Sequence, residues 1–132
     1  MQDLYHKIKA TKTIIPAVQT ATVTGTGVDL AGFESAVAFI HMGSLTDGTH
    51  TPKLQESSDN VNWTDVIAGG GGQLGSFTAL VANTGQAVGY INGQRYLRVL
   101  VTVSGAASGG LYGATIVAGD ARHQPVTSVQ AP

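Results

Sequence analysis

The side chains that could carry acid–base or metal chemistry are few and scattered along the chain. Among 132 residues there are eight acidic residues and four histidines, which are His6, His41, His50 and His123. No His-x-His, His-x-x-x-His or Glu-x-x-His spacing occurs, so no local signature of a metal site is present. The absence of cysteine excludes thiolate metal sites and a disulfide framework. The sequence therefore predicts no resident metal, no cofactor and no enzymatic activity.

One pair of histidines stands where a hairpin could bring them together. His41 and His50 flank the segment Thr46-Asp47-Gly48-Thr49, which has the composition of a tight turn. Two histidines facing each other across such a hairpin could hold zinc. A cross-strand pair on a solvated face is the more common arrangement, and we favour it.

Three carboxylates surround a second expected hairpin. Glu56, Asp59 and Asp65 could supply the paired acids of glycoside hydrolysis, which lie about 5 to 9.5 Å apart. They could also offer oxygen ligands to calcium, although they lack the spacing of a dedicated calcium loop. Asp59, however, lies in a Ser-Asp-Asn turn, where short polar side chains bond back to the backbone. We favour this structural interpretation.

The serines and glycines lack the context that catalysis or phosphate binding requires. Ser44 and Ser76 each follow a glycine but lack the second glycine of a nucleophile elbow. The glycine-rich segments 69–72 and 105–110 contain no lysine and open no helix, unlike phosphate-binding loops. We predict that both are mobile surface loops that could order on contact with a partner.

The aromatic residues have two interpretations. Trp63, the only tryptophan, is expected to fill a core or inter-sheet position, with a sugar-stacking platform or an interface anchor as alternatives. Tyr90, Tyr96 and Tyr112 belong to the last three expected strands, and with Arg98 they suggest an aromatic and basic patch. Too few basic residues are present for single-stranded nucleic acid, so a subunit interface is favoured.

Charge is the most unusual property of the composition. Only 11% of residues are charged, against about 25% in an average domain. With 42% hydrophobic residues and a net charge of −1, the chain is neither disordered nor suited to nucleic acid or anionic membranes. A surface so poor in charge does little to repel a neighbouring subunit. This favours assembly into a homo-oligomer over a monomer with a threonine-rich surface.

The elements that must position these residues are β-strands. Apolar and polar residues alternate, glycine-rich and Asx-rich turns recur, and helical periodicity is nearly absent. The expected strand segments are residues 12–18, 20–24, 35–42, 50–56, 62–67, 77–82, 86–91, 95–103 and 111–118. Because no helix-length pattern separates them, parallel α/β architecture is excluded. The pattern predicts an all-β fold of about eight strands, an antiparallel β-sandwich or jelly roll.

Two turns predict strand pairing. Thr46–Thr49 should join residues 35–42 to 50–56 as antiparallel partners. Asn92-Gly93 is the strongest hairpin signal, and a type I′ turn there requires positive φ at both residues. It should pair residues 86–91 with 95–103.

Both ends differ from the middle of the chain. We expect an N-terminal arm over residues 1–11, a β-sandwich domain over 12–119 and a C-terminal arm over 120–132. Leu4, Tyr5 and Ile8 have helical spacing, but the first nine residues cannot hold a helix unaided. Two interpretations of the arms remain open, since they could lie across a neighbouring subunit or be mobile.

Several segments together resemble a known group of proteins. They are Asp3–His6, Gly27–Leu30, Gly32–Ala36, Thr46–Ser57, Trp63–Val66, Gly89–Ile91 and Arg95–Val99. They resemble small proteins encoded in tailed phages and prophages, typically near the head genes. The resemblance covers roughly residues 3 to 118, and its motifs are hairpin segments without catalytic content. It implies a virion component such as a capsid decoration or cement protein, a type that commonly forms trimers on the head.

From these observations we expect a non-enzymatic virion protein that is made in the host bacterial cytoplasm and braces the major capsid protein at the capsid surface. Alternatives are another virion role, in the tail, head–tail joining region or fibre base, and a carbohydrate-binding module that takes a surface glycan. The expected interface residues are Leu4, Tyr5, Ile8, Trp63, Tyr90, Tyr96, Arg98 and Tyr112.

Overall fold

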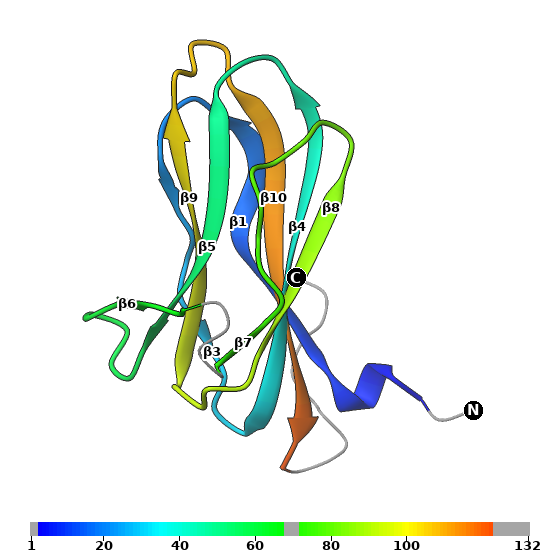
Figure 1. Ribbon diagram of the computed structural model, residues 1–132. Helices are drawn as coiled ribbons and strands as arrows, with labels where there is room; N and C mark the ends of the chain where they lie inside the picture. The colour runs from blue at the N-terminus through cyan, green and yellow to red at the C-terminus, as the bar shows by residue number, and fades with distance from the viewer. Residues whose placement is uncertain (1–2, 68–71, 123–132) are drawn as a thin grey trace.

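A computed structural model describes residues 3–67 and 72–122, and these form two antiparallel β-sheets packed face to face (Figure 1). The described part contains ten strands: β1 (Lys9–Gln19), β2 (Val23–Thr24), β3 (Val28–Asp29), β4 (Phe33–Leu45), β5 (Thr49–Ser57), β6 (Thr64–Asp65), β7 (Gln73–Leu74), β8 (Gly85–Tyr90), β9 (Tyr96–Ser104) and β10 (Gly110–Ala121). The predicted all-β sandwich is confirmed.

The two sheets draw on strands from the whole chain. Sheet A has the order β1-β10-β4-β8-β7, and sheet B has the order β2-β9-β5-β6, with β3 also paired to β9. Every pairing is antiparallel. Because β1 pairs with β10, the beginning and end of the described chain are held side by side in sheet A.

The core lies between the sheets and follows from period-two alternation. On β9, Leu97, Val99 and Val101 are 0% exposed, as the sequence pattern predicted. On β4, Ala38 and Ile40 are also 0% exposed. The remaining core residues include Ile14, Val28, Leu30, Leu54, Val88, Tyr90, Tyr112, Ala114, Ile116 and Ala118.

Both predicted hairpin pairings are wrong. The turn at Thr46–Thr49 links β4 in sheet A to β5 in sheet B, and β5 pairs with β9 and β6 instead. Asn92-Gly93 likewise lies between β8 in sheet A and β9 in sheet B. Gly93 has φ 80°, but Asn92 is outside the left-handed region, so the turn is not type I′. At both links the chain crosses from sheet A to sheet B, so that each sheet covers the apolar inner face of the other. The free energy gained by this burial outweighs the local preference for a hairpin turn.

The predicted strand at residues 77–82 does not form. The Gln86 side chain, and not a neighbouring strand, takes the backbone hydrogen bonds of Thr78. Gln86 Nε2 donates to the Thr78 carbonyl at 3.1 Å, and the Thr78 amide donates to Gln86 Oε1 at 2.9 Å. The Leu80 amide donates to the His50 carbonyl at 2.8 Å. The segments predicted as strands 20–24 and 62–67 are reduced to β2 and β6.

The ends of the described chain extend the sheet. A 3₁₀ turn, η1 (Tyr5–Lys7), precedes β1, and strand pairing begins at Lys9 opposite Ala118. Residues 9–11 of the predicted N-terminal arm therefore pair with β10, which continues to Ala121. Most of the predicted C-terminal arm, residues 123–132, lies outside the described residues. Among the described residues, no helix has the length and apolar character needed to cross a membrane.

A buried polar contact joins the sheets at one end of the sandwich. His50 on β5 is 1% exposed, and its Nδ1 lies 3.1 Å from the Tyr112 hydroxyl on β10. Its Nε2 lies 3.1 Å from the Asp47 carbonyl oxygen, which can only accept, so Nε2 donates and Nδ1 accepts from the tyrosine. Burial raises the pKa of Tyr112 to about 12.

A second polar contact joins the sheets at the other end. The Tyr90 hydroxyl on β8 donates to Glu56 Oε2 on β5 at 2.6 Å and accepts from the Gln94 amide at 3.0 Å. Asn92 Nδ2 donates to the same carboxylate at 2.8 and 2.9 Å. Burial and the adjacent Glu56 carboxylate raise the pKa of Tyr90 well above its usual value. The Asn92-Gly93 link thus covers a cross-sheet contact.

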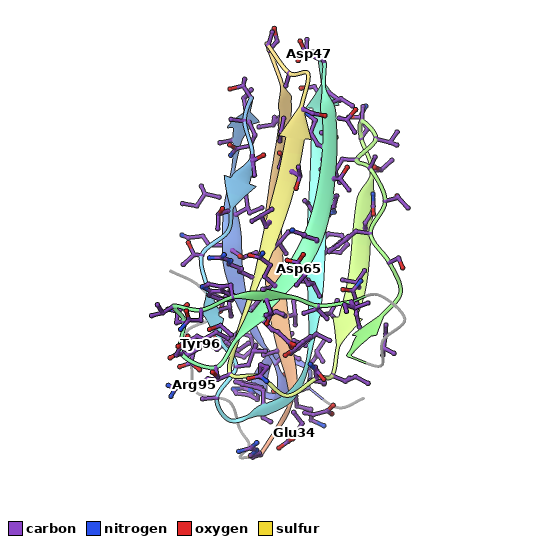
Figure 2. The ribbon with its side chains drawn as sticks, turned by 60° about the vertical axis from the view of Figure 1, so that its left-hand side comes forward. Glu34, Asp47, Asp65, Arg95 and Tyr96 are labelled. Atoms are coloured by element: carbon purple, nitrogen blue, oxygen red, sulfur yellow. The ribbon has the colours of Figure 1, made fainter. Side chains whose placement is uncertain are left out.

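The loop that joins β9 to β10 is tied down by one carboxylate. Asp47, at the end of the sandwich remote from Glu34 and Arg95 (Figure 2), accepts hydrogen bonds from the amides of residues 107, 108 and 109 at 2.7 to 3.2 Å. Gly48 lies against Ala106, where a Cβ would come within 2.6 Å of the alanine Cβ. The three amide donors hold the pKa of Asp47 below its usual range.

Replacing Tyr112 by phenylalanine should lower the free energy of unfolding by about 1–3 kcal/mol, because His50 Nδ1 loses its buried partner. Tyr96→Phe is the matched control, because the half-buried Tyr96 lies at the start of β9 outside the core, and it should stay within about 0.5 kcal/mol of the native protein. Urea unfolding of the three proteins measures both effects. Equal destabilisation by the two changes would contradict the assigned role of the cross-sheet contact.

Asp47 should make stability depend on pH in the acid range. Its pKa is lower in the folded chain than in the unfolded one, so its stabilisation is complete above about pH 4 and is lost as the pH falls through the folded-state pKa. Asp47→Asn should lower the midpoint of thermal unfolding at neutral pH, and the difference from the native protein should shrink on acidification. Glu34→Gln is the control, because among the described residues the Glu34 carboxylate pairs only with the exposed Arg122 guanidinium. A difference that stays constant with pH would contradict the prediction.

Candidate functional site

Over residues 37–43, 85–89 and 111–117 the outer face of sheet A carries no charged side chain. Charged groups lie at its margins, where Asp120 accepts a hydrogen bond from Ser35 and Lys12 pairs opposite Thr115. Buried residues alternate with outward ones on β4, β8 and β10. We call the outward set the A face; it consists of Val37, Phe39, His41, Gly43, Gly85, Ala87, Gly89, Leu111, Gly113, Thr115 and Val117. Val37 and Leu111 are 43% and 40% exposed. This is a largely apolar surface turned away from the protein's own core.

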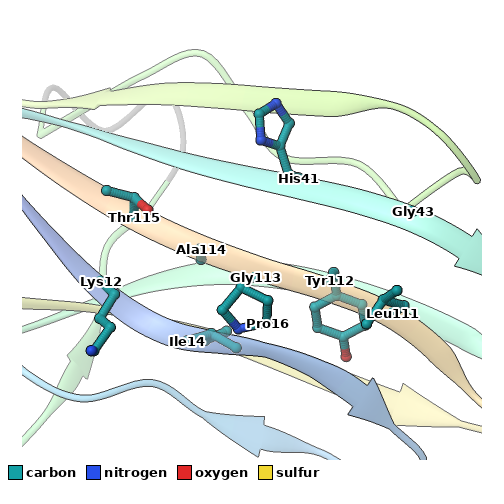
Figure 3. A pocket seen from close by; sticks show the side chains of 10 residues that line it. All are labelled: Lys12, Ile14, Pro16, His41, Gly43, Leu111, Tyr112, Gly113, Ala114 and Thr115. Atoms are coloured by element: carbon teal, nitrogen blue, oxygen red, sulfur yellow. The ribbon is translucent and has the colours of Figure 1, made fainter.

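A shallow hollow of about 260 Å³ lies in the A face beside the edge strand β1 (Figure 3). Pro16, Gly43 and Leu111 line it, and Lys12 and His41 stand at its sides. Its floor requires glycine at 113, because a Cβ there would come within 2.7 Å of the Pro16 ring. The hollow has the size and apolar lining to accept a side chain from another protein, and it has no converging set of catalytic groups.

The outer face of sheet B is polar and internally bonded. Arg98 Nε and Nη2 donate to Gln55 Oε1 at 2.9 and 2.7 Å, and Gln55 Nε2 donates to Asp65 Oδ1 at 2.9 Å. Lys53 Nζ donates to Asp65 Oδ2 at 3.1 Å. Gln55 and Lys53 together lower the pKa of Asp65. These groups satisfy one another and so offer few free donors or acceptors to a ligand.

Trp63 belongs to this outer face and not to the core, so the predicted core or inter-sheet position is wrong. The Arg98 guanidinium lies 4.1 Å from the centroid of its ring, a cation–π contact. Gly27 lies against the same ring, since a Cβ at 27 would come within 2.9 Å of it. Arg98 therefore occupies a ring face that a stacked sugar would need. The indole packs the loop after β5 onto sheet B.

The three carboxylates near this loop have separate structural partners. Asp59 Oδ1 accepts from the amides of Val61 and Asn62 at 2.9 and 2.8 Å, and these bonds lower its pKa strongly. Glu56 is held by Tyr90 and Asn92. Glycoside hydrolysis needs one carboxyl group with a raised pKa, whereas Asp59 and Asp65 are both shifted down. Within residues 3–67 and 72–122, no group of three acidic or histidine side chains could hold a metal ion.

The two histidines expected to face each other lie on opposite sides of sheet A. His41 lies exposed on the A face, with its ring centroid 4.2 Å from that of Phe39. His50 is buried between the sheets. The hypothesis of a histidine pair is wrong, because the turn between them carries the chain from one sheet to the other.

The expected interface residues divide into three groups. Leu4 and Tyr5 are 65% and 58% exposed, and Ile8 is partly exposed beside them. Trp63, Tyr96 and Arg98 are half-buried on sheet B. Tyr90 and Tyr112 are each 1% exposed, so they belong to the core, and their predicted place in an interface is wrong.

The predicted cluster of three tyrosines does not form. Tyr112 pairs with Met42 and Tyr90 with Ala36, six residues apart on β4, which is about 20 Å along the strand. Tyr96 lies on the other sheet, where its ring centroid is 5.1 Å from the Arg95 guanidinium.

The A face itself was not among the sequence predictions. Its signal is present in residues 35–42 (SAVAFIHM) and 111–118 (LYGATIVA), where apolar residues occupy both alternating positions. A strand of this kind is apolar on both sides, as in sheets covered on both faces. The segment 95–103 differs, because Arg98 and Thr102 mark a solvated side.

Gly27→Ala should destabilise the protein by about 1–3 kcal/mol, because the new Cβ would come within 2.2 Å of Asn60 Oδ1 and 2.9 Å of the Trp63 ring. Trp63 fluorescence should shift to longer wavelength as the ring moves into water. Gly43→Ala is the matched control, since its Cβ would meet nothing closer than 3.6 Å. Chemical unfolding followed by fluorescence measures both quantities, and an unshifted spectrum in Gly27→Ala would contradict the packing described for Trp63.

Comparison with known proteins extends the description of the fold. No protein-family model matches the chain, and no curated protein matches it in sequence. The structure of SPBc2 prophage-derived protein YomS has a TM-score of 0.54 at 19% identity, covering 84% of this chain and 92% of YomS. The structure of PBSX exported protein XepA has a TM-score of 0.59 at 15% identity, covering 100% of this chain and 43% of XepA. The chain thus shares a β-sandwich fold with two prophage proteins and spans less than half of the second.

Proposed function

We propose that this chain is a non-enzymatic structural protein of a phage virion, and that it is a capsid decoration protein that braces neighbouring capsid subunits. The observation that carries the proposal is the A face, an uncharged apolar surface on the solvent side of three adjacent strands. The fold shared with YomS and XepA supports an origin in a phage or prophage.

Covering the A face with protein is favourable, because no charged side chain of this face would lose its hydration. Burial of apolar surface releases water and stabilises by about 25 cal/mol per Å². Burial of a charge requires a partner to replace its hydration. The described ion pairs all lie elsewhere, at Asp3–His6, Lys53–Asp65, Asp29–Arg95 and Glu34–Arg122. Docking through the A face leaves every one of them undisturbed.

The N-terminal turn offers a second contact. Tyr5 begins the 3₁₀ turn η1, in which no residue is buried, and Leu4 precedes it as the N-cap; both are exposed. In Figure 1 this turn extends away from the lower end of the sandwich. We propose that Leu4 and Tyr5 contact an adjacent virion subunit, because burial of their exposed apolar surface favours docking.

Fractionation of virions tests the proposed function. The protein should be found by mass spectrometry in purified heads and not in isolated tails, and heads that lack it should rupture at a lower temperature. Purified protein added back should restore this temperature. Because the A face carries no charge, add-back at about 0.5 M salt should remain effective. Its presence in tails alone would assign the alternative virion role, and its absence from particles would refute the proposal.

Matched variants in the same assay test the N-terminal contact. Leu4→Ser combined with Tyr5→Ser should weaken add-back by at least about tenfold in the protein concentration required. Val61→Ser is the control, since Val61 is 76% exposed in the loop between β5 and β6. Equal behaviour of the two variants would show that the N-terminal turn makes no contact with the head.

A further inference from the structure

We propose that the edge of sheet A holds a slot for one extended strand beside Gly85 and Ala87 of β8, and that residues 126–130 of a second copy of this chain fill it. The inference goes beyond the proposed function, because it concerns how copies of the chain join one another. It rests on the backbone of β8, on the groove beside it and on the length of chain that follows Arg122.

Two residues of β8 direct their backbone groups to an open edge. On the β4 side of β8, the Met42 amide donates to the Thr84 carbonyl at 2.9 Å. The direction of hydrogen bonding alternates along an antiparallel strand, so the even-numbered residues of β8 bond to β4 and the odd-numbered residues face the other way. On that other side β7 has two residues and reaches only as far as Gly89. In the described part of the chain, no strand therefore lies opposite Gly85 and Ala87.

The chain turns away from this edge directly after β7. Gly75 has φ 84°, a left-handed conformation that ends the strand. Continuation of the β7 register would bring Thr78 opposite Gly85. The Gln86 side chain instead takes both backbone groups of Thr78, at 2.9 and 3.1 Å. The segment that could have completed sheet A is thus bonded to a side chain and not to the backbone of β8.

A groove of about 500 Å³ lies beside this edge, and it is lined by Ser76, Thr78, Val81, Thr84, Gln86 and Ala87. None of these six side chains is charged, and Val81 among them is 59% exposed. Unpaired backbone amides and carbonyls at strand spacing are matched by the backbone of another extended segment. The slot therefore suits an extended and uncharged peptide.

The other long edge strands are protected against such pairing. β1 contains Pro16, and its Thr13 carbonyl accepts from the Thr26 amide at 2.7 Å. β5 contains Pro52, and its His50 carbonyl accepts a backbone amide at 2.8 Å. Proline lacks an amide hydrogen and is a common means of blocking a sheet edge. β8 contains neither a proline nor a charged residue, so its edge is the one left open to a strand.

Residues 126–130 have the composition that the slot requires. Their sequence is Val-Thr-Ser-Val-Gln, which is uncharged and rich in the β-branched residues that favour strands. They follow the described part of the chain, which ends at Arg122. An antiparallel segment with Ser128 opposite Ala87 would place Gln130 opposite Gly85.

Distance assigns this strand to a second copy. Ala121 pairs with Phe33, and Val37 pairs with Gly89, which is where residue 126 would stand in this register. That position is about 13 Å along the strands and about 14 Å across the sheet from Ala121, or about 20 Å in a straight line. Five extended residues reach at most about 18 Å, and the straight line runs through β4 and β8. The segment of the same molecule therefore falls short of the slot.

Cysteines introduced into this cysteine-free chain test the slot. Ala87→Cys places a thiol at an exposed position of β8, and Ser128→Cys places one in the donated segment. Opposed residues of paired strands lie within the reach of a disulfide. When the two full-length variants are mixed and oxidised, their covalent heterodimer should form at least about tenfold faster than that of Ser128→Cys with Thr102→Cys. Thr102 is the matched control, because it is exposed on the outer face of sheet B. Non-reducing gel electrophoresis measures both rates.

Two outcomes would overturn the proposal. Equal rates for the Ala87→Cys and Thr102→Cys mixtures would show that no slot exists beside β8. In the double variant Ala87→Cys with Ser128→Cys, covalent oligomers are expected, whereas a disulfide within one chain would assign the slot to the same molecule. Head binding is measured separately, so a failed cross-link with intact docking on heads would refute the slot and retain the proposed function.

Discussion

The sandwich is held together by the closure of two apolar sheet faces over a single core. Leu97, Val99 and Val101 from sheet B meet Ala38 and Ile40 from sheet A, all of them fully buried. Complete burial of one such aliphatic side chain stabilises by about 1.5–3 kcal/mol, so the set outweighs any single polar contact in the molecule. The chain has no cysteine, and disulfides make no contribution. The polar links from β5 to Tyr112 and Tyr90 fix how the sheets sit on each other at both ends.

The need to close this core explains which sequence predictions were correct. Period-two alternation reports local burial, so the strands around Val99 and Ile40 and the β-sandwich class could be predicted. Turn composition reports only that the chain reverses direction. It does not report whether the next strand joins the same sheet, and for this reason the links at Thr46–Thr49 and Asn92-Gly93 were assigned to hairpins within one sheet. The pairing partners were fixed by contacts distant in sequence, such as β1 with β10.

The candidate surfaces were less predictable than the fold, for a related reason. Trp63 was expected inside because tryptophan is large and apolar, but Arg98 and Gly27 provide a packing site for it on the outside of sheet B. Tyr90 and Tyr112 were expected in an interface because, with Tyr96 and Arg98, they suggested an aromatic and basic patch, but each finds a buried hydrogen-bond partner. In each case the deciding group is remote in sequence and adjacent only across the fold. Leu4 and Tyr5 could be predicted as exposed, because their exposure follows from a short segment that has no partner strand.

The few charged side chains of this chain are unevenly distributed over its surface. Asp29 with Arg95 and Glu34 with Arg122 lie at one end of the sandwich, and Lys53 with Asp65 lies on sheet B (Figure 2). The A face residues of β4, β8 and β10 carry no charge, and exposed apolar faces promote association. Neither does folding require Val37 or Leu111 there, because neither contributes to the core. This distribution of charge supports the proposal that the A face is covered by another protein surface.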